Sequence, residues 1–247
     1  MTSTDLHLII KPSGPAILQR EKGGVKDNKP VELAEVIAEL GSGQDVRPGP
    51  FPPNTRNWAM SGTTRVVAVE LPPGKRDILT IRKSDGSCSQ MVVKGAALPA
   101  AMFFFVMRQE GKGVRMQLAH MFAMQNDRMI MDQDRLFHYP TPNVYTNTEK
   151  ITQICWGPGV DGTMPNLLGI EGLIQQFMTS VFNTDLFGTD KTSEQFPWDK
   201  IDNYLYVDQY FQLLSKESVF KSEWLLPAPA GYETIQKAFE TITKKHK

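Results

Sequence analysis

Cys155 is the residue whose surroundings in the sequence best suit covalent chemistry. It follows a short strand-like stretch and opens a loop rich in glycine and proline, residues 157–165. A thiol at the edge of a loop is accessible, as a nucleophile must be, whereas a core cysteine lies within an element. A cysteine can equally act as a small buried hydrophobe. The position alone therefore leaves two interpretations, a nucleophilic thiol or a packing residue.

Few other side chains near Cys155 are suited to assist it. His138 is the histidine nearest in sequence and is a possible general base, although a hydrogen-bonded surface histidine is the commoner arrangement. Cys88 lies in a polar turn and is interpreted as a surface thiol. The spacing of Cys155, His138 and His120 matches no compact zinc pattern, so we expect no metal and no cofactor.

Residues 157–162 spell GxGxxG, the glycine pattern of dinucleotide-binding turns. In such a turn the glycines open directly into a helix, and a second strand ending in an acid follows. Here Pro165 and Gly169 delay the next helix, and no such strand follows Phe182. We interpret the glycines as a loop.

The elements before Cys155 are predicted to be short strands. Apolar stretches separated by turn residues predict strands at 64–71, 78–81, 90–93, 102–107 and 114–124. Tight turns between successive strands favour an antiparallel meander over a parallel sheet. Near the N-terminus, a strand at 6–10 and a helix at 31–40 precede a connector, 41–57, that is rich in proline and glycine.

A helix is predicted directly after the Cys155 loop. Apolar side chains recur at i, i+3, i+4, i+7 and i+8 over residues 170–182, the pattern of an amphipathic helix with one buried face. Two further helices are predicted at 204–214 and 232–245. The fold class is therefore α+β, an antiparallel meander flanked by helices.

Composition limits the partners and the compartment. The 247 residues include 27 Lys plus Arg and 27 Asp plus Glu, without a polybasic run, which argues against nucleic-acid and anionic-membrane binding. No apolar run reaches the length of a membrane span, and the first residues lack the features of a signal peptide. Two cysteines do not make a disulfide framework. We expect an intracellular, cytoplasmic protein with free thiols.

The order of these motifs resembles the active-site region of ubiquitin-conjugating (E2) enzymes. In that family an antiparallel meander leads to a His-Pro-Asn motif, then to the catalytic cysteine, then to a helix. Here Thr141-Pro142-Asn143-Val144 stands in the place of His-Pro-Asn-Ile, and Ile154-Cys155-Trp156 in that of Ile-Cys-Leu. The pattern is most similar to the prokaryotic E2-like family D, which includes protein B of the plasmid-borne PRTRC system. The resemblance covers residues 63–187.

The resemblance implies an E2-like core at 58–190, between an N-terminal extension (1–57) and a C-terminal helical extension (191–247). It implies that Cys155 carries a ubiquitin-like protein as a thioester received from a ThiF-type E1 activator. A JAB-type peptidase is a further implied partner. The alternative is a non-catalytic interaction module with the same fold in a plasmid or mobile-element complex.

Two further site residues follow from this carrier chemistry. Asn143 would supply an amide donor that stabilises the oxyanion or holds the loop, although asparagine after proline is also a common turn residue. Asp161 would help to deprotonate an incoming lysine, or would form a turn beside Gly162.

Overall fold

The computed structural model describes residues 5–9, 16–22, 25–31, 50–84, 87–125, 131–145, 152–157, 160, 162–183, 186 and 206–246. The chain divides into two compact units, 1–49 and 50–247. The helix predicted at 31–40 and the candidate site residue Asp161 lie outside the described residues. None of the helices in the described ranges has both the length and the apolar character needed for a membrane crossing.

The first unit contains a three-stranded antiparallel sheet. Strands β1 (Asp5–Ile9), β2 (Ala16–Lys22) and β3 (Val25–Val31) lie in that order. The strand predicted at 6–10 is confirmed as β1. The other two strands were not predicted, because their charged residues interrupt the apolar alternation that indicates a strand.

The second unit is built on an antiparallel sheet with the strand order β10-β9-β8-β5-β4, and β11 pairs with β9. Its strands are β4 (Thr55–Ser61), β5 (Thr64–Leu71), β8 (Ala100–Glu110), β9 (Gly113–Met124), β10 (Phe137–His138) and β11 (Thr163–Met164). The strand predicted at 64–71 is β5, residue for residue. Strand β4 begins inside the range predicted to be a connector.

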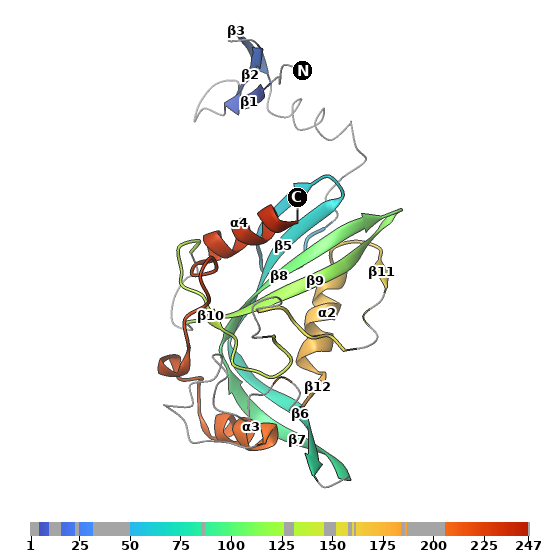
Figure 1. Cartoon of the computed structure of the whole chain (residues 1–247), viewed down its shortest axis with the longest axis vertical. Coiled ribbons are helices and arrows are strands. Elements are labelled where there is room, and N and C mark those ends of the chain that lie inside the picture. Colours follow the sequence, from blue (N-terminus) through green and yellow to red (C-terminus); the bar gives the residue numbers. More distant parts are fainter. Residues whose placement is uncertain are drawn as a thin grey trace. The chain divides into compact units, whose positions relative to one another are not determined.

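Two of the predicted strands leave this sheet. Strands β6 (Gly74–Ser84) and β7 (Ser87–Leu98) form a hairpin in a second sheet, where the short β12 (Val181–Phe182) pairs with β6 in parallel. The change of sheet occurs at Pro72-Pro73, between β5 and β6, and at Pro99, between β7 and β8. Proline has no N–H to donate to a ladder, so the single predicted meander divides at these positions. Figure 1 shows the hairpin extending away from the main sheet.

The main sheet buries both of its faces. Phe103 and Phe105 of β8 point to the face covered by α2 (Gly169–Met178), whereas Phe104 and Val106 point to the face covered by α4 (Ile235–Lys245). Because successive side chains of a strand point to opposite faces, a continuous apolar run indicates a strand buried on both sides. Figure 1 shows α2 and α4 on opposite sides of this sheet.

Helix α2 is shorter than predicted. Its buried residues match the predicted apolar face from Ile170 to Met178, but the helix ends there instead of at Phe182. The hydroxyl of Thr179 donates to the carbonyl of Gln175 (2.8 Å), and that of Ser180 donates to the carbonyl of Phe177 (2.7 Å). Hydroxyls that bond the last carbonyls compete with continued helical pairing. The chain then enters β12.

The C-terminal residues pack onto the sheets. Helix α3 (Val207–Lys216) lies on β7 and β6, and the short 3-10 turn η1 (Ser222–Trp224) leads toward α4. The side chain of Thr234 caps α4 by accepting the N–H of Lys237 at 3.2 Å. Both predicted helices therefore exist, and they belong to the same compact unit as the sheet. The structure is a mixed α+β fold with antiparallel sheets.

Candidate functional site

The segments around Asn143 and Cys155 form a short antiparallel ladder. The N–H of Tyr145 donates to the carbonyl of Gln153, and the N–H of Thr152 donates to the carbonyl of Tyr145, both at 2.8 Å. At the other end of the ladder, the N–H of Cys155 donates to the carbonyl of Asn143 at 2.7 Å. The two motifs suggested by the sequence therefore lie side by side.

Strand β9 holds this ladder in place. The N–H of Ile154 donates to the carbonyl of Ala119 (2.8 Å), and that of Met121 donates to the carbonyl of Thr152 (2.9 Å). Thr152 has a φ of 64°, unusual for a β-branched residue, and its hydroxyl lies 2.9 Å from Nδ1 of the buried His120. The ladder is thus an extension of the main sheet along β9.

Alternation along the ladder decides which side chains are exposed. Val144 and Ile154 pair directly and are buried in the core. Side chains alternate across a strand, so Asn143, Tyr145 and Cys155 share the opposite face. All three are partly exposed. The prediction that Cys155 is at least partly exposed is confirmed for the residue.

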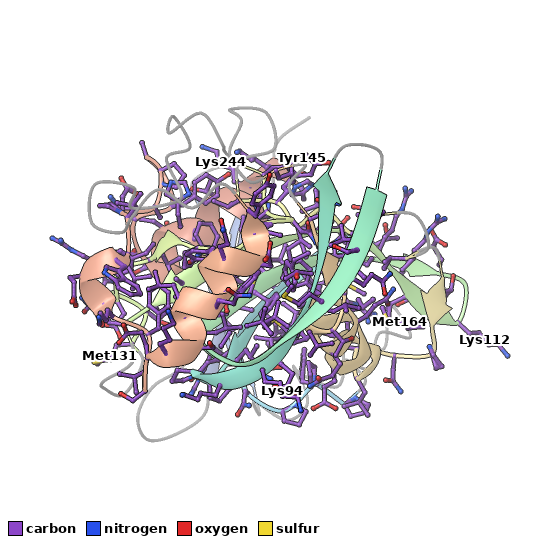
Figure 2. The ribbon with its side chains drawn as sticks, turned by 90° about the horizontal axis from the view of Figure 1, so that it is seen from below. Lys94, Lys112, Met131, Tyr145, Met164 and Lys244 are labelled. Atoms are coloured by element: carbon purple, nitrogen blue, oxygen red, sulfur yellow. The ribbon has the colours of Figure 1, made fainter. Side chains whose placement is uncertain are left out.

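Tyr145 contacts the thiol directly. Its hydroxyl donates a hydrogen bond to Sγ of Cys155 at 3.4 Å. The two residues are diagonal neighbours in the ladder, a separation that a tyrosine side chain can span. The hydrogen bond with Cys155 raises the pKa of the Tyr145 phenol, so the phenol stays protonated and remains a donor at neutral pH. Tyr145 is labelled at the top of Figure 2.

Asn143 fixes the loop at a second point. It has a φ of 70°, in the left-handed region that asparagine tolerates better than most residues. Its Nδ2 donates to the carbonyl of Val181 in β12 at 3.2 Å. The side chain therefore links the Cys155 loop to the segment after α2, as expected for a loop-holding residue. One of its two amide hydrogens is used in this bond.

Trp156 anchors the chain on the other side of the thiol. Its ring packs against Phe105 of β8 and Phe177 of α2, with centroid separations of 6.4 and 5.8 Å. Gly157 follows with a φ of 66°, a conformation that glycine adopts without strain. Cys155 thus lies between the buried Ile154 and the packed Trp156, and this packing fixes its position.

The other candidates that the structure describes do not contact the thiol. Asp161 lies outside the described residues. His138 is buried in β10, not on the surface, and within the described ranges no hydrogen bond joins it to Cys155. Cys88 is exposed in β7. The glycine-rich loop continues into β11 before the helix, as expected for a plain loop. Among the described residues no cluster of His, Cys, Asp and Glu could hold a metal.

Sequence analysis did not identify Tyr145 as a partner of the thiol. The signal was present in the alternation of Asn143-Val144-Tyr145, in which the apolar residue is flanked by two polar ones. Predicting the contact from that pattern requires the pairing of Val144 with Ile154, which no local pattern of the sequence specifies.

The arrangement places the sulfur of a partly exposed cysteine beside a neutral hydroxyl donor, on a backbone held at both ends. Such a sulfur can attack a carbonyl and accept an acyl group, while the donor stabilises the negative charge on sulfur. Comparisons with protein-family models, curated proteins and solved structures found no match to this chain.

Proposed function

We propose that this protein is an E2-like thioester carrier that holds a ubiquitin-like protein on Cys155. The observation that carries the proposal is the hydrogen bond from the Tyr145 hydroxyl to an accessible Cys155 thiol, which lies on a loop fixed by Asn143. The order of the elements also supports it. An antiparallel sheet, a proline-containing segment, the cysteine and a helix follow one another as in E2 enzymes.

The chemistry requires two acyl transfers. In the first, the Cys155 thiolate attacks the thioester carbonyl of the activator, a carbon–sulfur bond forms, and the thiolate of the activator leaves. In the second, an amine attacks the new thioester, loses its proton to a base, and Cys155 leaves as a thiolate. Tyr145 donates to the sulfur, so it stabilises the thiolate at the start of the first transfer and at the end of the second.

The partners follow from the resemblance to the prokaryotic E2-like family D. A ThiF-type E1 would activate the ubiquitin-like protein with ATP, and a JAB-type peptidase would remove it from its targets. The absence of a histidine or acid bonded to Sγ of Cys155, among the described residues, is compatible with exchange between thioesters. Such exchange is nearly balanced in energy and does not require a strongly activated thiol.

The test is a charging reaction with purified activator, ATP and ubiquitin-like protein. We expect the wild type to form an adduct that is visible on a non-reducing gel and is cleaved by excess thiol. Cys155→Ser should give an ester that resists thiol, or no adduct, because a hydroxyl is a weaker nucleophile than a thiol. Cys88→Ser is the matched control and should charge like the wild type, because Cys88 lies on β7, in the other sheet.

Asn143→Gly removes the side chain without changing the backbone, because glycine adopts the left-handed conformation without strain. The variant therefore tests the role of the amide side chain alone. If the Asn143 amide stabilises the oxyanion that forms when an amine attacks the Cys155 thioester, this variant should transfer to lysine more slowly than the wild type. Charging and transfer of Cys155→Ser at wild-type rates would refute the carrier mechanism.

A second candidate function is a non-catalytic interaction module with the same fold. The observation that favours it is the bond between Asn143 Nδ2 and the carbonyl of Val181, because this bond directs the amide to β12 and not to the sulfur. In that case no adduct forms with any activator, and Cys155→Ser leaves complex formation with the partner proteins unchanged.

A further inference from the structure

Strand β4 forms an edge of the main sheet and exposes large apolar side chains. It pairs with β5 on one side and ends the strand order on the other. Trp58 and Met60 are 43% and 42% exposed, whereas most large apolar residues of the sheet are buried. The ring centroids of Phe51 and Trp58 are 5.2 Å apart, and residues 51–52 and 54–58 line a surface hollow. We call Phe51, Trp58, Met60 and the neighbouring Arg65 the β4 edge surface.

Backbone groups on the outer edge of β4 are available to pair with an added strand. The N–H of Trp58 donates to the side-chain oxygen of its neighbour Asn57 at 2.8 Å, so it faces away from β5. Polar backbone groups of an antiparallel strand alternate between its two edges, so the N–H of Met60 also faces outward. A local side-chain bond of this kind is exchanged readily for a bond from an added strand.

Arg65 is the second, independent feature of this surface. It lies on β5 directly opposite Met60 and on the same face of the sheet. Arg65 as a residue is only 7% exposed, and within the described part of the chain no ion pair or hydrogen bond engages its guanidinium. The guanidinium nitrogens are not among the enclosed polar atoms without a partner, so they reach the surface. Burial lowers the pKa of this guanidinium, but arginine stays charged at neutral pH. The guanidinium is therefore a positive charge at the surface with part of its hydration removed, and a carboxylate can pair with it.

A carboxylate that pairs with Arg65 would approach from the β4 side. Met107, the neighbour of Arg65 on β8, is fully buried, whereas Met60, the neighbour on β4, is exposed. A strand added beside β4 would lie two strand spacings from β5, about 9.5 Å. An arginine and a glutamate that extend toward each other over Met60 can span this distance.

We propose that β4 binds an extended acidic segment of a partner protein by strand addition. The backbone of the segment pairs with the outward groups of Trp58 and Met60, its carboxylate pairs with Arg65, and its apolar side chains cover Trp58. This surface lies away from Cys155, which is held beside β9, and it does not depend on the carrier function.

The charge of the surface distinguishes this partner from a second copy of the chain. Strand β4 contains no Asp or Glu, so a second copy paired through its own β4 would bring no carboxylate from that strand to Arg65. Arg56 adds no free charge, because it pairs with Glu70. Strand β7 is also an edge strand and exposes Met91 and Val92. Among the side chains that the structure describes on its neighbour β6 there is no buried arginine, so β7 serves as a matched control.

The test uses a fluorescein-labelled peptide, Thr-Glu-Thr-Val-Thr-Glu-Thr, whose Glu and Val side chains share one face when it is extended. Fluorescence anisotropy with the full chain should show saturable binding. Arg65→Met should weaken this binding about tenfold, the effect of losing one charge-assisted hydrogen bond. Hydrogen exchange should show that the peptide protects the amide of Met60. Replacing Glu by Lys, or methylating the peptide nitrogens that face β4, should abolish binding.

Two controls keep the result interpretable. Methionine at position 65 suits the apolar surroundings of Met60 and Met107, so Arg65→Met should melt no lower than the wild type. Val92→Ser on β7 should leave peptide binding unchanged. The proposal is overturned if millimolar peptide shows no binding, if the Glu and Lys peptides bind equally, or if Trp58 is covered in a dimer of the free protein.

Discussion

The backbone N–H of Cys155 donates a 2.7 Å hydrogen bond to the carbonyl oxygen of Asn143, and Asn143 has a left-handed backbone. The conformation of one residue therefore sets the position of the other, twelve positions along the chain. The contributions of the Asn143 backbone conformation and of its side chain can therefore be measured separately with two substitutions.

Asn143→Ala should destabilise the fold more than Asn143→Gly. Both variants lose the bond to the carbonyl of Val181, worth about 1 kcal/mol. Alanine also has to adopt the left-handed conformation, which costs roughly 1–2 kcal/mol, whereas glycine does not. Urea unfolding of both variants measures the difference. Equal stabilities would show that the left-handed backbone is not retained.

Tyr145→Phe should reduce the reactivity of Cys155. The phenylalanine ring keeps the packing but removes the hydroxyl that donates to Sγ, so the thiolate loses a hydrogen bond. We expect alkylation by iodoacetamide to slow roughly fivefold to tenfold at neutral pH. The measurement is made with Cys88→Ser present in both proteins, because Cys88 is exposed and would also react. An unchanged rate would mean that Tyr145 does not act on the sulfur in solution.

Two buried tyrosines should respond differently to removal of their hydroxyls. The Tyr210 hydroxyl donates to the carbonyl of Pro140 at 2.8 Å, whereas the buried Tyr139 hydroxyl has no hydrogen-bond partner among the described residues. Tyr210→Phe should therefore lower the free energy of unfolding by about 1 kcal/mol. Tyr139→Phe should be neutral or stabilising, because it removes an unsatisfied buried polar group. Thermal unfolding of the two variants provides the comparison, and a larger loss for Tyr139→Phe would contradict it.

The same two tyrosines should make the fold sensitive to alkali. Burial raises the pKa of both phenols above their ordinary value. Below the unfolded-state value of about 10, both phenols are neutral in either state, and stability is fully present. Above it, the unfolded phenols ionise while the folded ones do not, so stability falls by up to about 1.4 kcal/mol per pH unit for each phenol.

The double variant Tyr139→Phe/Tyr210→Phe provides the control for this pH dependence. Its free energy of unfolding should decline less steeply than that of the wild type in urea titrations above about pH 10. Parallel slopes for the two proteins would show that neither phenol is protected from ionisation in the folded state.

The sequence by itself determined the elements whose signal is local. Strand β5 and the buried face of α2 were predicted because apolar periodicity and turn residues are properties of neighbouring positions. The accessibility of Cys155 also followed from a local feature, its place between an apolar stretch and a glycine-rich loop. The mixed α+β class came from the same patterns.

Only the tertiary structure decided which distant residues meet. The hydrogen bond between Tyr145 and Cys155 depends on the pairing of Val144 with Ile154, and a shift of one residue would turn Tyr145 into the core. The residues that follow α2 enter β12, which pairs with β6 about a hundred positions earlier in the chain. The burial of Arg65 likewise depends on the surroundings of β5. Register and packing between distant segments are not encoded in any short window, so side-chain chemistry that depends on them appears only in the fold.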